Sequence, residues 1–160
     1  MGSSDERIEA WRLLLQTHAA VLRAIERDLA RAGHVPLTWY DVLLELNAAP
    51  RRRLRMQELS NRVVLSRTRV SRLVDEMAAN DLVVKEPDEQ DRRSTFTVLT
   101  ATGRTALRRA APVYLDAIER HFTRHLGDRR RAAIIDALRT VLAAQDVVEG
   151  RGRSVVPRVR

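Results

Sequence analysis

Two short helical patterns lie directly before two strand patterns in the middle of this chain. The helices are predicted over residues 56–64 and 66–79, and Leu65-Ser66 forms the turn between them. Strand patterns follow at residues 82–86 and 95–99, on either side of a charged, turn-rich segment. A helix pair followed by such a hairpin is the element order of a winged helix-turn-helix unit.

Long helical patterns lie on both sides of this unit, which we place at about residues 38–99. Apolar residues recur at helical spacing over residues 6–32 and again over residues 101–145. The first of these helices is long for a small domain, so a second subunit is a natural surface for it to pack against. The predicted fold is mainly α with a small β-hairpin wing. The expected boundaries are a disordered N-terminus at 1–5, a single domain at 6–146 and a basic, flexible tail at 147–160.

Positive charge is concentrated in one part of the chain. The net charge is +8, and residues 51–72 contain eight arginines against a single glutamate. An arginine-rich composition, with Lys85 as the only lysine, explains the preference for arginine but not its concentration in this segment. Such a concentration creates a local positive field suited to phosphate groups. The predicted phosphate contacts are Arg53, Arg55 and Arg62.

The second helix of the pair begins with a basic segment that has no acidic residue between Ser66 and Arg72. Arginine can contact guanine through two hydrogen bonds, and serine or threonine can bond to bases or phosphates. A solvated charged face is the alternative, but its arginines would usually alternate with acids that pair along the helix. We therefore predict that this end of the helix reads DNA. The predicted contacts are Ser66, Arg67, Thr68, Arg69, Ser71 and Arg72.

The tip of the hairpin carries a second basic signal. Arg92 and Arg93 can reach the narrow minor groove of DNA, where the negative potential is enhanced. Asp91 does not suit a phosphate, but it can pair with a neighbouring arginine and hold it in position. A plain surface hairpin is the alternative, which the preceding helix pair disfavours. We predict that Asp91, Arg92 and Arg93 form a DNA-binding wing.

These residues resemble the MarR family of bacterial transcriptional regulators. The resemblance is carried in order by LSRTRVSRLVD at 65–75, Leu82-Val83, Asp91-Arg92-Arg93 and LTATG at 99–103. It covers about residues 6–145. It implies an obligate, intertwined homodimer in which the first helix and the last two helices pack against the partner, with the winged units outside.

The resemblance also implies roles for single residues. Asp91 and Arg93 match the wing Asp-x-Arg element of the family, and residues 66–72 match the start of its recognition helix. Asn80-Asp81 stand where the family usually has a glycine.

Many relatives release DNA when a small phenolic or anionic molecule binds between the dimerisation helices and the DNA-binding unit. Such an effector is expected to contact Trp11, His18, Trp39 and Tyr40, because they add polar tips to apolar helix faces. Core packing is the alternative explanation for each of these four residues.

Catalysis, metal binding and a cofactor are not expected. Cysteine is absent, which excludes a disulfide, a thiolate metal site and thiol oxidation. His121 and His125 have a spacing that could supply two metal ligands, but no obvious carboxylate or cysteine completes the set. No apolar run is long enough to span a membrane and no secretion signal is evident, which predicts a cytoplasmic protein without a membrane partner.

The sequence therefore predicts a transcriptional regulator that binds double-stranded DNA, specifically a palindromic operator, as a homodimer. We expect a repressor, and an activator is the alternative for the sign of regulation. Two other functions stay open at this point. One is a nonspecific architectural DNA-binding protein with no ligand response, and the other is a helical protein-interaction module.

Overall fold

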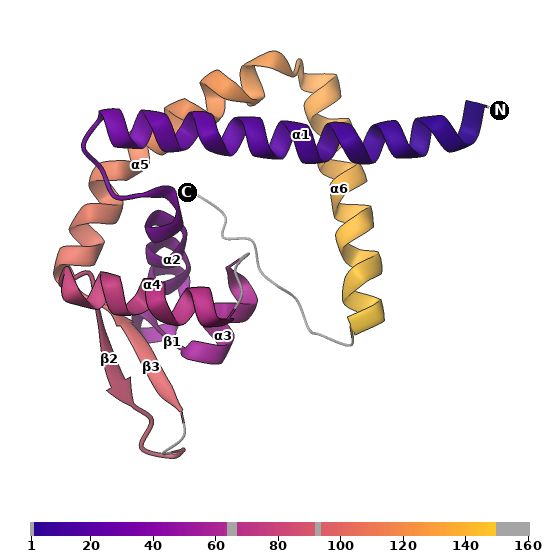
Figure 1. Cartoon of the computed structure of the whole chain (residues 1–160). Coiled ribbons are helices and arrows are strands. Elements are labelled where there is room, and N and C mark those ends of the chain that lie inside the picture. The colour runs from indigo at the N-terminus through magenta and orange to yellow at the C-terminus, as the bar shows by residue number, and fades with distance from the viewer. Residues whose placement is uncertain (1, 64–66, 92–93, 150–160) are drawn as a thin grey trace.

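The computed structural model describes residues 2–63, 67–91 and 94–149 of the chain, and six α-helices and one small sheet lie in this part (Figure 1). This architecture confirms the mainly α prediction. The helices are α1 (Gly2–Arg31), α2 (Leu37–Ala48), α3 (Met56–Arg62), α4 (Arg67–Ala79), α5 (Ala101–His121) and α6 (Asp128–Glu149). The strands are β1 (Arg53–Arg55), β2 (Val83–Pro87) and β3 (Thr95–Leu99), and the 3-10 helices are η1 (Pro50–Arg52) and η2 (Thr123–His125).

The sheet is antiparallel, with β3 between β1 and β2. Strands β2 and β3 form the predicted hairpin, which projects beyond the helices as a wing (Figure 1). Arg55 lies opposite Phe96 on one side of β3, and Lys85 lies opposite Thr97 on the other side. Because side chains alternate across a strand, the wing has an outer face with Phe96 and an inner face with Thr97.

The core lies where the C-terminal half of α1 meets α2, α3, α4, α5 and the sheet. Helix α4 contributes Val70, Val74 and Met77, whose i, i+4, i+7 spacing places them on one face of the helix. The largest fully buried side chains are Leu29, Val42, Leu43, Leu46, Leu59, Val70, Val74, Met77, Val83 and Thr97.

The N-terminal half of α1 and the whole of α6 extend away from this core (Figure 1). Both helices expose large apolar side chains, which is unusual for the surface of a monomeric protein. These exposed side chains are Ile8, Trp11, Leu13, Leu14, Leu15 and Leu22 on α1, and Ile135, Leu138, Val141 and Leu142 on α6.

The helix ends correct two predicted boundaries. Helix α1 begins at Gly2, within the segment 1–5 that was expected to be disordered, and α6 continues through residues 147–149 of the expected tail. Asp5 lies in the first turn of α1, where a carboxylate interacts favourably with the helix dipole. No glycine or proline interrupts α6 before Gly150, so its hydrogen-bonded ladder continues. Residues 150–160 lie outside the described residues.

The end of α4 explains the departure at Asn80-Asp81. Asp81 has a φ of 56°, in the left-handed region that favours glycine. The N–H groups of Asp81 and Leu82 donate to the carbonyls of Ala78 (3.1 Å) and Met77 (3.0 Å), which is the Schellman arrangement. Asp81 therefore adopts the conformation of a helix-ending glycine, because aspartate tolerates it better than most residues do.

Candidate nucleic-acid interface

Helix α4 has one buried face and one exposed face at its N-terminal end. Val70 and Val74 are fully buried in the core, whereas Thr68, Arg69 and Arg72 are exposed. Three exposed side chains with hydrogen-bond donors thus lie on the side that a DNA groove could meet. Ser71 is half-buried. Arg67 opens the helix with its side chain outside the description, and Ser66 lies outside the described residues.

The wing turn and Ser71 of α4 line the same groove. Asp91 is exposed in the turn, whereas Arg92 and Arg93 lie outside the described residues. The turn is closed by backbone hydrogen bonds from Asp88 N–H to the Ser94 carbonyl (3.1 Å) and from Ser94 N–H to the Asp91 carbonyl (2.8 Å). These bonds hold the base of the turn that presents Asp91.

A buried carboxylate fixes the wing to β1. Asp88 is only 5% exposed, and its Oδ2 accepts a hydrogen bond from Arg55 Nε at 2.8 Å. Arg55 Nη2 forms an ion pair with the same oxygen at 2.7 Å. Its Oδ1 accepts from the backbone N–H of Gln90 at 2.9 Å. The N–H of Gln90 and the Arg55 guanidinium hold the pKa of Asp88 below its usual value. Arg55 therefore serves as an internal brace of the wing in this structure.

The other two predicted phosphate contacts also pair within the chain. Arg53 lies over the Phe96 ring, 4.4 Å from its centroid, and 3.8 Å from a Glu86 carboxylate oxygen. Arg62 Nη1 lies 3.6 Å from Glu45 Oε2, which joins α3 to α2. Three of the eight arginines of residues 51–72 thus have a carboxylate partner within the chain. A phosphate role for these arginines stays a prediction.

The inner face of the wing borders a polar groove that sequence reasoning missed. The groove has a volume of about 520 Å³ and lies between α3, α4 and the wing. Lys85 reaches into it from β2, and its Nζ pairs with Asp75 of α4. The alternation of side chains along β2 could have indicated this position, because it places Lys85 on the same face of the strand as buried Val83. The lining residues are Met56, Gln57, Ser60, Ser71, Lys85, Asp91, Ser94 and Thr95.

This arrangement of helices and wing agrees with known proteins. Residues 35–94 match the sequence profile of the MarR family. The structure also resembles that of Sco3205 from Streptomyces coelicolor, a MarR family transcriptional regulator in complex with DNA. The TM-score is 0.80 and the sequence identity 30%, covering 88% of each chain. This chain belongs to the MarR family.

Two further relatives agree with this assignment. The MarR family regulator AbsC from Streptomyces coelicolor has a TM-score of 0.79 and 28% identity, covering 92% of this chain and 97% of AbsC. The HTH-type transcriptional regulator YkoM of Bacillus subtilis is 24% identical over 127 residues, which are 77% of this chain and 80% of YkoM. The protein is a DNA-binding transcriptional regulator of the MarR family and not an enzyme. No helix in the described part is long and apolar enough to cross a lipid bilayer.

The four predicted effector contacts of this MarR chain are not brought together. Trp11 is 61% exposed on α1, whereas Tyr40 is buried in the core with its ring centroid 4.4 Å from that of Tyr114. Burial raises the pKa of Tyr40 to about 12. Trp39 is half-buried against the core, and His18 lines an apolar cavity between α1 and α6. Core packing explains Tyr40 and Trp39.

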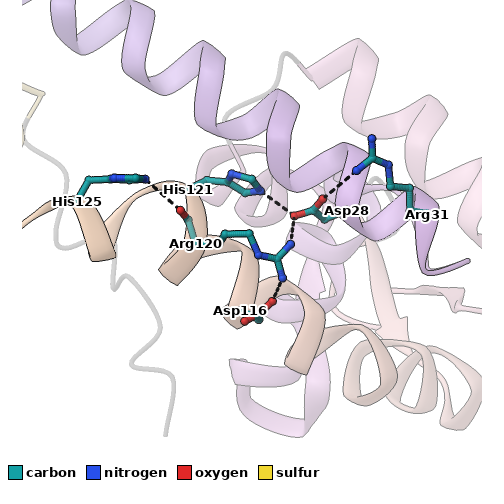
Figure 2. A network of polar contacts seen from close by, with 6 residues as sticks. All are labelled: Asp28, Arg31, Asp116, Arg120, His121 and His125. Carbon is teal, nitrogen blue, oxygen red and sulfur yellow. Dashed lines mark hydrogen bonds and ion pairs between the residues drawn. The ribbon is translucent and has the colours of Figure 1, made fainter.

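The two histidines with metal-ligand spacing contact different groups in this MarR chain. His121 Nε2 lies 2.7 Å from Asp28 Oδ2, and His125 Nε2 lies 3.1 Å from the Arg120 carbonyl oxygen (Figure 2). Arg120 also contacts Asp28, at 3.0 Å, and pairs with Asp116. The His121 hydrogen bond holds the pKa of Asp28 below its usual value. These residues join α1 to α5.

Proposed function

We propose that this MarR protein is a sequence-specific repressor that binds a palindromic operator as a homodimer. The observation that carries this proposal is the exposed N-terminal end of α4. There Thr68, Arg69 and Arg72 lie opposite a buried apolar face, and a wing projects from the same unit (Figure 1). A recognition helix needs such a division, because it packs on its own core while the other face enters the major groove.

The exposed apolar faces of α1 and α6 support the homodimer. They contain ten large side chains that a single chain leaves in water. A second copy that covers these faces would place two α4 helices on one face of DNA, about 34 Å apart. The DNA complex of Sco3205 supports a DNA role for the shared fold.

Selection of bound DNA from a random pool tests the proposal. We expect recovered sequences to contain two inverted half-sites, bound about 10³-fold more tightly than random DNA. Equal binding to every duplex would instead indicate an architectural protein. Binding that does not weaken as salt increases would eliminate a phosphate-based interface and favour a protein-interaction module.

Arg69→Ala tests base recognition by α4. The variant is expected to lose about 1–3 kcal/mol of binding to the selected operator and to relax the preference at one base pair in each half-site. Competition binding against operators with single base changes measures this. Arg27→Ala, which removes an exposed arginine from the C-terminal half of α1, is the matched control and should bind like the original protein. A uniform loss across all sequences would make Arg69 a phosphate contact.

A small phenolic or anionic effector is the second part of this proposal. The cavity between α1 and α6 has a volume of about 550 Å³, which is within the range of small-molecule sites, and His18 lies among its apolar lining residues. A bound effector is expected to raise the melting temperature and weaken operator binding. A thermal-shift screen of phenols and aromatic carboxylates checks this, with His18→Ala as the control. Stabilisation that the His18→Ala variant retains in full would contradict a role for His18.

A further inference from the structure

The groove on the inner face of the wing has the features of a phosphate-binding site. It lies between the two helices of the helix-turn-helix pair and the wing, so residues from α3, α4, β2 and the wing turn all line it. Its side chains are mostly polar and small. Lys85 is the only cation in the described lining, and it is also the only lysine of the chain.

The sheet register explains why Lys85 points into this groove. Lys85 lies opposite Thr97, which is fully buried, so both side chains are on the inner face of the wing. The Lys85 ammonium donates a hydrogen bond to the carboxylate of Asp75 on α4. The Asp75 side chain is 61% exposed and that of Lys85 34% exposed, so water screens this ion pair. An incoming anion can therefore replace Asp75 at little energetic expense.

The outer face of the wing contrasts with this groove. There Arg53 and Arg55 contact Phe96, Glu86 and Asp88, which balance their charge. The inner groove has Lys85 beside hydroxyl groups. Ser60 donates its hydroxyl proton to the Met56 carbonyl at 2.9 Å, which leaves the hydroxyls of Ser71, Ser94 and Thr95 to meet a ligand. Asp91 is the one carboxylate in the described lining.

We propose that a backbone phosphate of bound DNA occupies this groove and is held by Lys85 with the hydroxyls of Ser71 and Thr95. This inference rests on the proposed function. A DNA strand that passes from the major groove at α4 to the minor groove at the wing crosses the space between them. Lysine binds phosphate as a point charge, and serine and threonine hydroxyls commonly bond to phosphate oxygens. Asp75 holds the Lys85 ammonium until the phosphate replaces it.

Salt-dependent binding of Lys85→Met to a labelled duplex tests the proposal. A phosphate contact acts on any sequence, so a random-sequence duplex of about 30 base pairs serves as the probe before an operator is known. We expect weaker binding by about tenfold at moderate salt. The slope of log affinity against log salt should fall by about 0.9 for each phosphate lost, and hence by about 1.8 for a dimer.

Asp75→Asn is the matched control, because it breaks the same ion pair but leaves the lysine charge in place. If Lys85 binds phosphate, Asp75→Asn binds DNA as well as or better than the original protein, with the slope retained. If the ion pair only braces α4 against β2, Asp75→Asn loses as much affinity as Lys85→Met, and the proposal is wrong. Unchanged affinity and slope in Lys85→Met would also overturn it.

Two further results separate this proposal from the proposed function. If the original protein binds no duplex at any salt concentration, the proposed DNA-binding function itself is wrong.

If circular dichroism shows that Lys85→Met is unfolded, the double variant Ser71→Ala with Thr95→Val replaces it in the test. This double variant is expected to weaken binding at least about tenfold, because two hydroxyl hydrogen bonds to a charged phosphate are lost. Unchanged binding by a folded double variant would contradict the site.

Discussion

The Leu138→Glu substitution is expected to separate the dimer and to abolish tight binding to the operator. Leu138 is 38% exposed on α6 and lies among apolar side chains of α1 and α6. A carboxylate at this position would be buried without a partner if a second copy covered the face, which strongly disfavours association. Because two linked half-site contacts reinforce each other, loss of the dimer is expected to weaken operator binding at least about 100-fold.

Sedimentation of the purified variant and its DNA affinity together measure this effect. Val141→Glu is a second variant for the same test, because Val141 is 57% exposed and makes no part of the cavity lining. Val84→Glu is the control for sedimentation alone, since Val84 is a similarly exposed apolar residue that lies on the outer face of the wing and not on α1 or α6. A folded dimer in both α6 variants would show that the interface lies elsewhere.

The Gly103→Ala substitution is expected to destabilise the fold by about 3 kcal/mol, at the upper end of what overpacking usually causes. A Cβ at this position would lie 2.1 Å from the Leu82 carbonyl oxygen and 2.8 Å from Leu99 Cδ1. That carbonyl accepts hydrogen bonds from Thr100 N–H at 3.2 Å and from Thr100 Oγ1 at 3.0 Å. Helix α5 would therefore have to move away from the wing base and stretch these bonds.

Urea unfolding followed by circular dichroism checks this expectation. Gly127→Ala is the matched control, because a Cβ there meets no atom within 4 Å. It should leave stability unchanged or raise it by about 0.5 kcal/mol, since alanine restricts the unfolded chain. Equal stability of the two variants would mean that α5 adjusts to the added methyl group without loss.

Sequence patterns predicted the elements of the fold that depend on interactions between residues close in sequence. The β-branched segment around Phe96 identified a strand, and Val70, Val74 and Met77 have the spacing that places them on one buried face of α4. Thr100 caps α5, because its side-chain oxygen accepts a hydrogen bond from Gly103 N–H at 2.9 Å. Each of these features depends on residues that are close in sequence.

The pairing of charges could not be predicted in the same way. Arg55 and Asp88 are 33 residues apart, and only the register of three strands brings them together. The arginines of residues 51–72 were therefore expected to face phosphates, whereas three of them contact carboxylates in this structure. Lys85 was not predicted as a site residue for the same reason, since its groove forms only when α3, α4 and the wing assemble.

Two carboxylates of α1 that are two residues apart contact two different helices, Glu26 contacting α2 and Asp28 contacting α5. Glu26 Oε2 accepts a hydrogen bond from Leu37 N–H at 2.7 Å, at the first residue of α2, and Asp28 contacts Arg120 and His121 of α5. This short stretch of α1 thus contacts both α2 and α5, and these contacts contribute to the angle between α1 and the DNA-reading unit. In a two-fold assembly this angle sets the distance between the two reading helices, so a hinge at Glu26 and Asp28 would change which operator spacing the protein accepts.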